Sequence, residues 1–179
     1  MLLPPIMVMP PSAADIDARA QRVRALLLDV DGVLTDGRMT YLPGGGETRS
    51  FHVRDGLGVQ LLMAAGIPVV FISGKRNEVV QRRGEELGVK LLKLGVEDKV
   101  AAFEACVQEL DVTEEEVAYV GDDLPDLPLI RRCGLGFAVA DAAPEVRATA
   151  NVVLRANGGQ GAVREVCERI LKAKGNWRV

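Results

Sequence analysis

The sequence has 179 residues, of which 48% are hydrophobic and 26% charged, and this composition fits one globular domain with a substantial core. Its formal net charge of −3 at pH 7 argues against general nucleic-acid binding, which is typical of basic domains, so any affinity for an anion must be local. The three cysteines, Cys106, Cys133 and Cys167, have no CxxC spacing, which favours small apolar residues in a reducing compartment over a metal site or a catalytic thiol.

The N-terminal segment, MLLPPIMVMPPSAAD (1–15), is apolar but interrupted by prolines. It lacks the basic start of a signal peptide, and it is too short to cross a bilayer. We therefore expect residues 1–23 to form a loose tail and residues 24–179 to form a single domain. The expected protein is cytoplasmic and contacts no membrane.

From residue 24 onward, apolar runs alternate with segments that carry a helical pattern. The apolar runs predict buried parallel strands at 25–30, 67–72, 89–94, 117–121, 135–139 and 151–154. The helical patterns lie at 56–65, 75–87, 98–110, 125–133, 144–149 and 161–173. This alternation predicts an α/β fold, a doubly wound parallel sheet with helices on both faces.

One segment, RMTYLPGGGETRSFHV (38–53), breaks the alternation. It has two extended arms around a proline and three glycines, which is typical of a β-hairpin. Met39 and Tyr41 alternate on one arm, and Phe51 and Val53 alternate on the other. We expect a hairpin flap with apolar side chains and, because no insertion is long enough, no cap domain.

Polar side chains follow the predicted strands at the point where each strand ends. In chain order they are Asp29, Asp31, Ser73, Lys99 and Asp122. Because the carboxyl ends of parallel strands meet at one edge of a sheet, we expect these side chains to lie together. Carboxylates are rarely buried without a partner, so Asp29 at the end of an apolar strand indicates a functional site.

These residue types suit phosphoryl transfer with Mg²⁺. In proteins Mg²⁺ is held by one or two carboxylates, so Asp29 and Asp122 predict a magnesium site. The Asp29 carboxylate could then attack phosphorus to form an aspartyl-phosphate, while Asp31 protonates the leaving oxygen and later deprotonates water. Ser73 and neighbouring amides would hold phosphate oxygens, and Lys99 would offset negative charge.

The same motifs resemble those of the haloacid dehalogenase superfamily. The matching segments are DVDGVLTDG (29–37), FISGK (71–75), EDK (97–99) and GDDLPD (121–126). Further segments resemble the capless subclass that contains 3-deoxy-D-manno-octulosonate 8-phosphate (KDO 8-phosphate) phosphatase. They are FHVRDGLG (51–58), YVGDDLPDLP (119–128) and GGQGAVREV (158–166).

The resemblance implies hydrolysis of KDO 8-phosphate to phosphate and KDO, a lipopolysaccharide precursor, with Asp29 as nucleophile and Asp31 as acid/base. It makes the carboxylates of Asp29 and Asp122 and the backbone carbonyl of Asp31 the magnesium ligands. It also implies a homotetramer in which hairpins meet at the centre and neighbouring chains complete each site. The implied substrate contacts are Asp31, His52, Val53, Arg54, Asp55, Gly56, Gln60, Lys75, Arg83 and Lys99.

The sequence departs from this pattern at a few positions. The octulosonate enzymes carry arginine where Gln60, Lys75 and Gln160 stand here, so a substrate carboxylate would be held less tightly. The alternative substrate is therefore a related nine-carbon 2-keto-3-deoxy sugar acid phosphate. His52, the single histidine, fits a contact to a sugar hydroxyl or a structural hydrogen bond better than catalysis.

Other functional classes are also compatible with a cluster of acids at strand ends. A signalling receiver domain gathers acids, a Ser/Thr and a Lys around Mg²⁺, but its acid pair and its phosphorylated aspartate precede the Ser/Thr and the Lys. Here an acidic cluster at 122–126 follows Lys99, and Asp31 has the position of a proton shuttle. A catalytically silent, assembly-forming relative is disfavoured by the intact motifs. We expect a small sugar-acid phosphate as the partner, and no nucleic acid.

Overall fold

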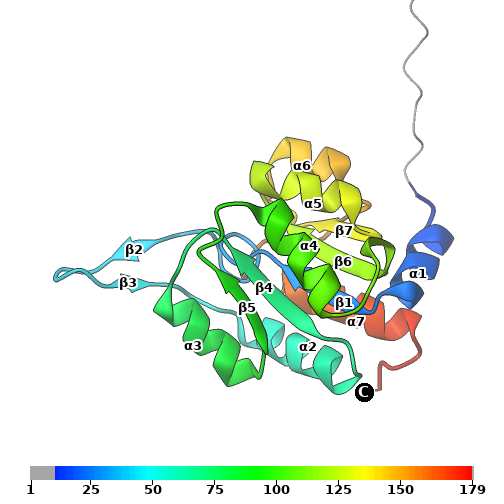
Figure 1. Cartoon of the computed structure of the whole chain (residues 1–179), viewed down its shortest axis with the longest axis horizontal. Coiled ribbons are helices and arrows are strands. Elements are labelled where there is room, and N and C mark those ends of the chain that lie inside the picture. The colour runs from blue at the N-terminus through cyan, green and yellow to red at the C-terminus, as the bar shows by residue number, and fades with distance from the viewer. Residues whose placement is uncertain (1–10, 179) are drawn as a thin grey trace, which may run out of the picture.

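A six-stranded parallel sheet forms the centre of the structure, which is a computed structural model that describes residues 11–178 (Figure 1). The strands are β1 (Ala25–Leu28), β4 (Val69–Ser73), β5 (Leu91–Leu94), β6 (Val117–Gly121), β7 (Leu135–Ala138) and β8 (Val152–Val153). They lie in the order β5-β4-β1-β6-β7-β8, and each neighbouring pair is parallel. The predicted doubly wound sheet is confirmed.

The order in which strands are added to the sheet reverses at its centre, at β1. The chain moves outward from β1 to β4 and β5, and then returns to the other side of β1 to add β6, β7 and β8. In open α/β sheets, the crevice that binds ligands lies outside the carboxyl ends of the strands at this reversal. β1 and β6 are paired up to Leu28 and Val120, so the residues that follow these two strands lie side by side.

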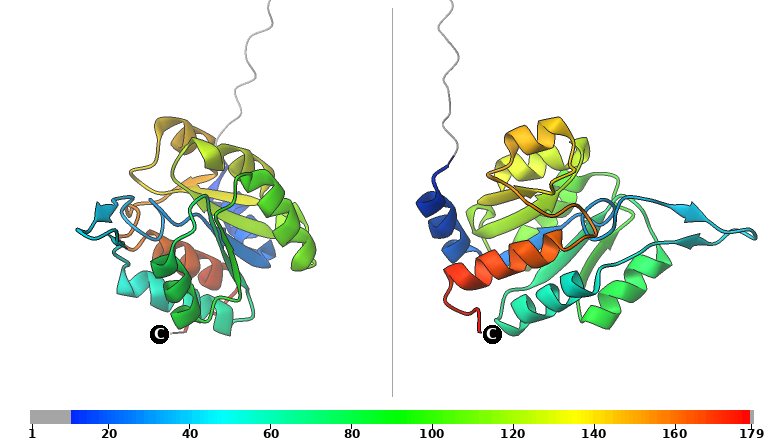
Figure 2. Two further views of the ribbon diagram at one scale, coloured as in Figure 1. Left: turned by 60° about the vertical axis from the view of Figure 1, so that its left-hand side comes forward. Right: turned by 180° about the vertical axis from the view of Figure 1, so that it is seen from behind.

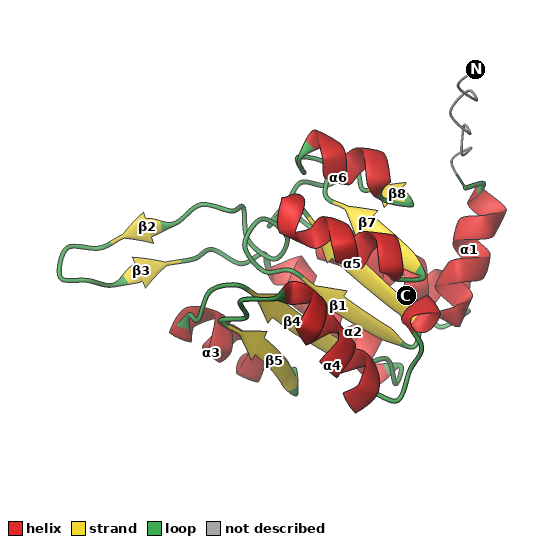
Figure 3. Ribbon diagram, turned by 45° about the horizontal axis from the view of Figure 1, so that its top comes forward, coloured by secondary structure: helices red, strands yellow, loops and turns green. Residues whose placement is uncertain are grey.

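Helices cover both faces of the sheet. On one face α2 (Val53–Ala64) and α7 (Ala162–Ala173) pack against each other, as Figure 2 shows from behind, and α3 (Glu78–Leu87) packs beside α2 and on β5. On the other face, α4 (Lys99–Glu109) and α5 (Leu127–Arg132) lie in front of the strands in Figure 3, with α6 (Pro144–Thr149) against α5. Two short 3₁₀ turns, η1 (Glu114–Glu116) and η2 (Leu124–Asp126), flank β6.

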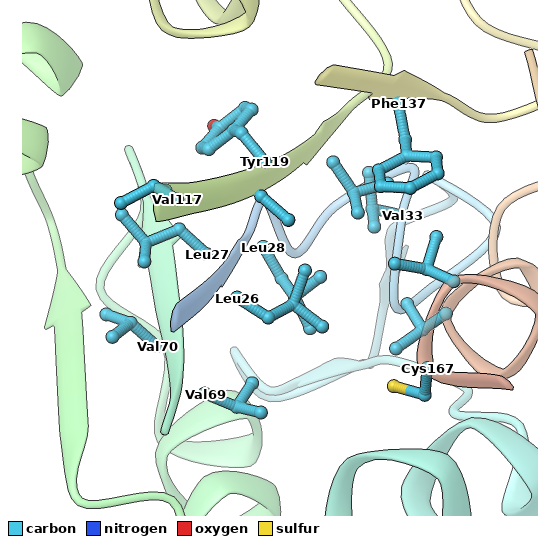
Figure 4. Close-up of a cluster of buried hydrophobic side chains, with 14 of the residues drawn as sticks. Leu26, Leu27, Leu28, Val33, Val69, Val70, Val117, Tyr119, Phe137 and Cys167 are labelled. Carbon is cyan, nitrogen blue, oxygen red and sulfur yellow. The ribbon is translucent and has the colours of Figure 1, made fainter. Parts of the chain in front are cut away.

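The core is continuous through the sheet. Leu26, Leu27 and Leu28 of β1 are fully buried, among Val69 and Val70 of β4, Tyr119 of β6 and Phe137 of β7 (Figure 4). A strand that is covered on both faces has no polar side, which explains the continuous apolar run in its sequence. The cysteines are buried and free, as expected, and burial raises the pKa of each thiol.

The expectation of a loose N-terminal tail is wrong for the part that the structure describes. A helix, α1 (Ala13–Arg22), begins after Ser12, whose side chain forms a capping box with Asp15. Ile16 and Ala20 are buried on the side of α1 that faces the body, where α1 packs on α7. The remainder of the predicted tail, residues 1–10, lies outside the described residues. Within residues 11–178, no helix combines the length and apolar character needed to cross a lipid bilayer.

The predicted hairpin is present and extends away from the rest of the molecule (Figures 1 and 3). Its strands, β2 (Thr40–Tyr41) and β3 (Glu47–Thr48), are antiparallel. Met39 and Tyr41 of the first arm are 38% and 72% exposed.

The alternation predicted for the second arm of the hairpin does not continue to its end. Phe51 packs against the core, and Val53 is the first residue of α2. The strand pattern ends here because His52 caps the helix that follows.

Candidate active site

The side chains expected at the strand ends line one cavity of about 470 Å³. The lining includes Asp29, Asp31, Ser73, Lys99 and Asp122, together with Lys75, Glu97 and Asp126. These residues lie at or just after the carboxyl ends of β1, β4, β5 and β6, as far as the first residue of α4 and the η2 turn. The carboxyl edge of the sheet therefore brings six carboxylates together, those of the five acids named above and of Asp123, with the Ser73 hydroxyl and two ammonium groups.

Lys99 forms ion pairs with two carboxylates in this cavity. Its Nζ lies 2.8 Å from Oδ1 of Asp29 and 2.6 Å from Oδ1 of Asp126. It is the first residue of α4, whose N-terminus Asp98 caps by accepting two backbone N–H groups. Burial alone would lower the pKa of Lys99, but the charges of Asp29 and Asp126 outweigh it and raise that pKa. The ammonium group therefore stays charged next to Asp29.

Asp126 has a structural role that the sequence did not reveal. It is fully buried, and its Oδ1 also accepts a hydrogen bond from the Tyr119 hydroxyl at 2.7 Å. Its Oδ2 accepts the backbone N–H groups of Asp122 at 3.0 Å and Asp123 at 3.3 Å. Asp126 thus holds the loop that carries Asp122 and orients Lys99. The available signal was the spacing in GDDLPD, which places Asp126 one tight turn after Asp122.

We expect Tyr119→Phe to destabilise the protein by about 1.5–3 kcal/mol, because a hydrogen bond to a buried charged acceptor is lost. Urea unfolding followed by circular dichroism measures this change. Tyr41→Phe is the matched control, because it keeps the aromatic ring and removes a hydroxyl that contacts the Met39 sulfur at 4.0 Å, so it should unfold like the parent. Equal stability of both variants would contradict the role assigned to the Tyr119 hydroxyl.

Glycine is required at position 32, where the loop that follows β1 meets Asp122. The φ of Gly32 is +92°, and a Cβ at this position would lie 2.1 Å from Oδ2 of Asp122. A second loop packs behind it, because a Cβ on Gly158 would lie 1.8 Å from the Gly32 carbonyl oxygen, and the Gly159 N–H donates to the Val33 carbonyl. The glycines of the GGQG segment (158–161) therefore allow this loop to pack against the loop that carries Asp31.

The carboxylates at the bottom of the cavity fit a divalent cation. Asp29, Asp122 and Asp126 each offer an oxygen within 4.8 Å of the others. Burial, followed by the charge of Asp126, raises the pKa of Asp29 to about 6. Burial and then the charge of Asp29 raise the pKa of Asp122 to about 8. A hard cation would favour the ionised forms of both.

The hydrogen bonds that these carboxylates accept distinguish Asp126 from Asp29 and Asp122. Both oxygens of Asp126 already accept hydrogen bonds within the chain. Asp29 and Asp122 therefore fit a metal ion better than Asp126 does, and their role as ligands stays a prediction. The backbone carbonyl of Asp31, the third expected ligand, belongs to a residue that lines the same cavity.

Three other expected site residues also lie in the cavity. Ser73 is buried at the end of β4, and its Oγ accepts the backbone N–H of Lys75 at 3.2 Å. Asp31 lies at the cavity wall, where its Oδ1 accepts a hydrogen bond from Nε of Arg49 at 2.6 Å. Arg49 comes from the hairpin and was not identified from the sequence.

The remaining expected substrate contacts do not line this cavity in the described part of the chain. They are His52, Val53, Arg54, Asp55, Gly56, Gln60 and Arg83. They lie on or just before α2 and on α3. Arg54 and Gln60 are exposed, and Val53 is 80% exposed.

Several of these residues have contacts within their own chain. Nδ1 of His52 accepts the backbone N–H of Arg54 at 3.1 Å, the structural hydrogen bond that was one expectation for this histidine. Asp55 is buried and accepts the backbone N–H groups of Gly161 at 3.2 Å and Arg164 at 2.7 Å, at the start of α7. Burial raises the pKa of Asp55, although these two hydrogen bonds oppose the shift.

Arg83 lies against the segment that precedes and begins α2. Its guanidinium carbon is 5.8 Å from the centre of the Phe51 ring. A Cβ on Gly56 would lie 2.3 Å from an Nη atom of Arg83, so only glycine allows this approach. Arg83 and the 52–56 segment therefore form a second group of the expected residues next to the hairpin, in which Asp55 and Gly56 are buried and Val53 and Arg54 are exposed.

Comparison with known proteins identifies the family. A family model of haloacid dehalogenase-like hydrolases matches residues 89–166. The 3-deoxy-D-manno-octulosonate 8-phosphate phosphatase of Escherichia coli is 44% identical over 165 residues, which cover 92% of this chain and 88% of that protein. The chain belongs to the KDO 8-phosphate phosphatase family. This membership excludes the alternative class of a receiver domain.

Solved structures of the KDO 8-phosphate phosphatase family have the same fold. The enzyme from Yersinia pestis is 42% identical with a TM-score of 0.91, over 93% of this chain and 90% of that one. The enzyme from Moraxella catarrhalis, solved in complex with a magnesium ion, a phosphate ion and a KDO molecule, is 40% identical with a TM-score of 0.90. That match covers 92% of this chain and 95% of that one. The expected haloacid dehalogenase fold is confirmed.

Proposed function

We propose that this chain is a Mg²⁺-dependent phosphomonoesterase that hydrolyses KDO 8-phosphate to KDO and inorganic phosphate, a step in the supply of lipopolysaccharide precursors in the cytoplasm. The buried Asp29, paired with Lys99 at 2.8 Å and facing the same cavity as Asp31, is the observation that carries the proposal. The family of the chain supports the substrate, since the E. coli relative is named for this phosphate ester.

Each residue of the cavity has a distinct task in the proposed reaction. Ser73 and Lys99 hold the phosphate oxygens, and Lys99 offsets the charge next to Asp29. When bound by Asp29, Asp122 and the carbonyl of Asp31, Mg²⁺ would neutralise part of the phosphate charge. Asp29 then forms a bond to phosphorus as the bond from phosphorus to the sugar oxygen breaks, and Asp31 donates a proton to that oxygen. Asp31 next takes a proton from water, which attacks the aspartyl-phosphate and releases phosphate.

A preference for sugar-acid phosphates tests the proposed substrate. KDO 8-phosphate has a carboxylate that glucose 6-phosphate lacks, and hydrogen bonds to a charged group contribute about 1.5–3 kcal/mol. We therefore expect kcat/KM for KDO 8-phosphate to exceed that for glucose 6-phosphate by about 10–100-fold. Phosphate release from both esters, and from a nine-carbon 2-keto-3-deoxy sugar acid 9-phosphate, measures it. Equal kcat/KM values for KDO 8-phosphate and glucose 6-phosphate would show that the protein does not recognise the carboxylate of the sugar acid. A clear preference for the nine-carbon acid would favour the alternative substrate.

We also propose that the chain assembles as a homotetramer in which hairpins meet and neighbouring chains complete each cavity. Two observations support this. Exposed apolar side chains lie on the hairpin, Tyr41 and Leu42, and along α2, where Val53, Leu57 and Leu61 recur every four residues. Arg83 and the residues 52–54 lie outside the cavity of their own chain and are exposed or partly exposed, so they are available to a neighbour.

Sedimentation velocity at micromolar concentration should therefore give a species of four 19.2-kDa chains. We expect Tyr41→Glu to dissociate it and to lower kcat/KM, because a carboxylate would be buried between copies. Val153→Glu is the control, since Val153 is 45% exposed on β8, away from the hairpin. A fully active monomer would contradict the proposal.

A further inference from the structure

Arg49, between β3 and α2, is a buried arginine to which the reaction described above gives no task. Its side chain is 0% exposed, and its Nε lies 2.6 Å from Oδ1 of Asp31. One of its Nη atoms lies 3.2 Å from Oε2 of Glu47. Burying a guanidinium group is costly unless carboxylates pair with it. Asp31 and Glu47 are the carboxylates that pair with it here.

The partners of Arg49 are themselves held in place. Glu47 of β3 accepts a hydrogen bond from the side-chain amide of Asn77. Asn77 is 5% exposed and caps α3, because its Oδ1 accepts the N–H groups of Val79 at 2.8 Å and Val80 at 3.1 Å. A continuous set of polar contacts therefore joins Asp31 to the start of α3 through the base of the hairpin.

Arg49 donates to Asp31 through one N–H group, that of Nε. Among residues 11–178, neither Nη atom of Arg49 has a hydrogen-bond partner with good geometry, so its well-formed hydrogen bond is the one to Asp31. Because Oδ1 of Asp31 accepts that bond, Oδ2 is the oxygen left to carry the proton. The Asp31 side chain is 24% exposed in a loop, so without Arg49 it could rotate away from the cavity.

We propose that Arg49 is a positioning residue that holds the Asp31 carboxylate in the orientation required for proton transfer, with Glu47 and Asn77 fixing the guanidinium group. This inference rests on the proposed phosphatase function. A misplacement of a reacting group by about 1 Å can lower a rate about 10²-fold, so the contact would affect turnover and not only stability.

The leaving group distinguishes positioning from a purely structural role. An alkoxide must be protonated as it leaves, whereas p-nitrophenolate leaves without a proton. In Arg49→Met we expect the formation of the aspartyl-phosphate from KDO 8-phosphate to slow by about 10–100-fold. With p-nitrophenyl phosphate, the rate of the initial release of one equivalent of p-nitrophenolate should change less than about threefold. The later turnover should be slow, because the attack of water on the aspartyl-phosphate also needs Asp31. Stopped-flow and rapid-quench measurements on the Mg²⁺-loaded enzyme provide both rates.

Matched variants accompany this comparison. Arg49→Lys should recover part of the lost rate, since an ammonium group can still contact Asp31. Arg82→Met is the control, because the Arg82 side chain is 82% exposed on α3, and both rates should stay at parental values. If Arg49→Met does not fold, Asn77→Ser decides, because it keeps a capping oxygen for α3 and removes the donor to Glu47. It should show the same dependence on the leaving group with a smaller loss.

Equal losses with both esters, or no loss with either, would overturn the positioning role. A parent enzyme that hydrolyses p-nitrophenyl phosphate but not KDO 8-phosphate would instead overturn the proposed function. In that case the same ratio, measured with the sugar phosphate that the enzyme prefers, still decides the role of Arg49.

Discussion

Replacing Asp31 with asparagine is expected to lower kcat for KDO 8-phosphate by about 10²–10⁴-fold, the usual contribution of a general acid or base. Asparagine has nearly the same shape, and its Oδ1 can still accept the hydrogen bond that Arg49 donates at 2.6 Å. The substitution therefore removes proton transfer while it keeps the local contacts. A sugar alkoxide is a poor leaving group, so the step that forms the aspartyl-phosphate should carry much of the loss.

Binding of the phosphate ester should change much less than turnover. Ser73, Lys99 and the metal site are untouched by the substitution, so KM should stay within about tenfold of the parental value. Steady-state phosphate release gives both constants. Asp36→Asn is the control, because Asp36 is exposed in the same loop and accepts the backbone N–H of Arg38 outside the cavity. A kcat for Asp31→Asn within threefold of the parent would show that another group transfers the proton.

Removing divalent cations is expected to reduce turnover by at least about 10²-fold. Asp29 is buried beside the half-buried Asp122. The pKa values of the two carboxyls are raised, to about 6 and about 8, first by burial and then by a neighbouring carboxylate, Asp126 for Asp29 and Asp29 for Asp122. Lys99 contributes one positive charge near Asp29, which does not balance the carboxylates and a phosphate dianion. The approach of an anionic nucleophile to an anionic ester therefore requires a cation.

The measurement is phosphate release after exhaustive chelation, followed by titration with Mg²⁺. Chelator that was saturated with Mg²⁺ beforehand is the control for direct effects of the chelator. Asp122→Asn provides an independent check, because it keeps the volume of the side chain and removes one charge, and it should raise the Mg²⁺ concentration needed for half-maximal activity. Undiminished activity after chelation would exclude a metal-dependent reaction.

The sequence alone identified most of the elements that carry the site, and missed those whose stability depends on tertiary packing. The run Leu26–Leu28 identified β1, because a strand covered on both faces must be apolar throughout. The helix α1 was missed, because the prolines before Ser12 suggested a tail. Its packing on α7, which buries Ile16 and Ala20, stabilises the helix together with the capping box of Ser12 and Asp15. The hairpin was identified from its turn residues, but the end of its second arm was not, because the cap at His52 begins a helix.

The sequence by itself determined the fold class, the family and the set of side chains at the carboxyl edge, because buried parallel strands dictate a pattern and all end at the same edge. Asp29, Ser73 and Asp122 follow from this rule without any knowledge of their distances. Only the tertiary structure decided which partner each side chain has. Asp55 caps α7 across 109 positions of the sequence, and Arg49 reaches Asp31 across 18. Such pairs leave no periodic signal, since they depend on how the hairpin and the helices pack, and packing is a property of the whole folded chain.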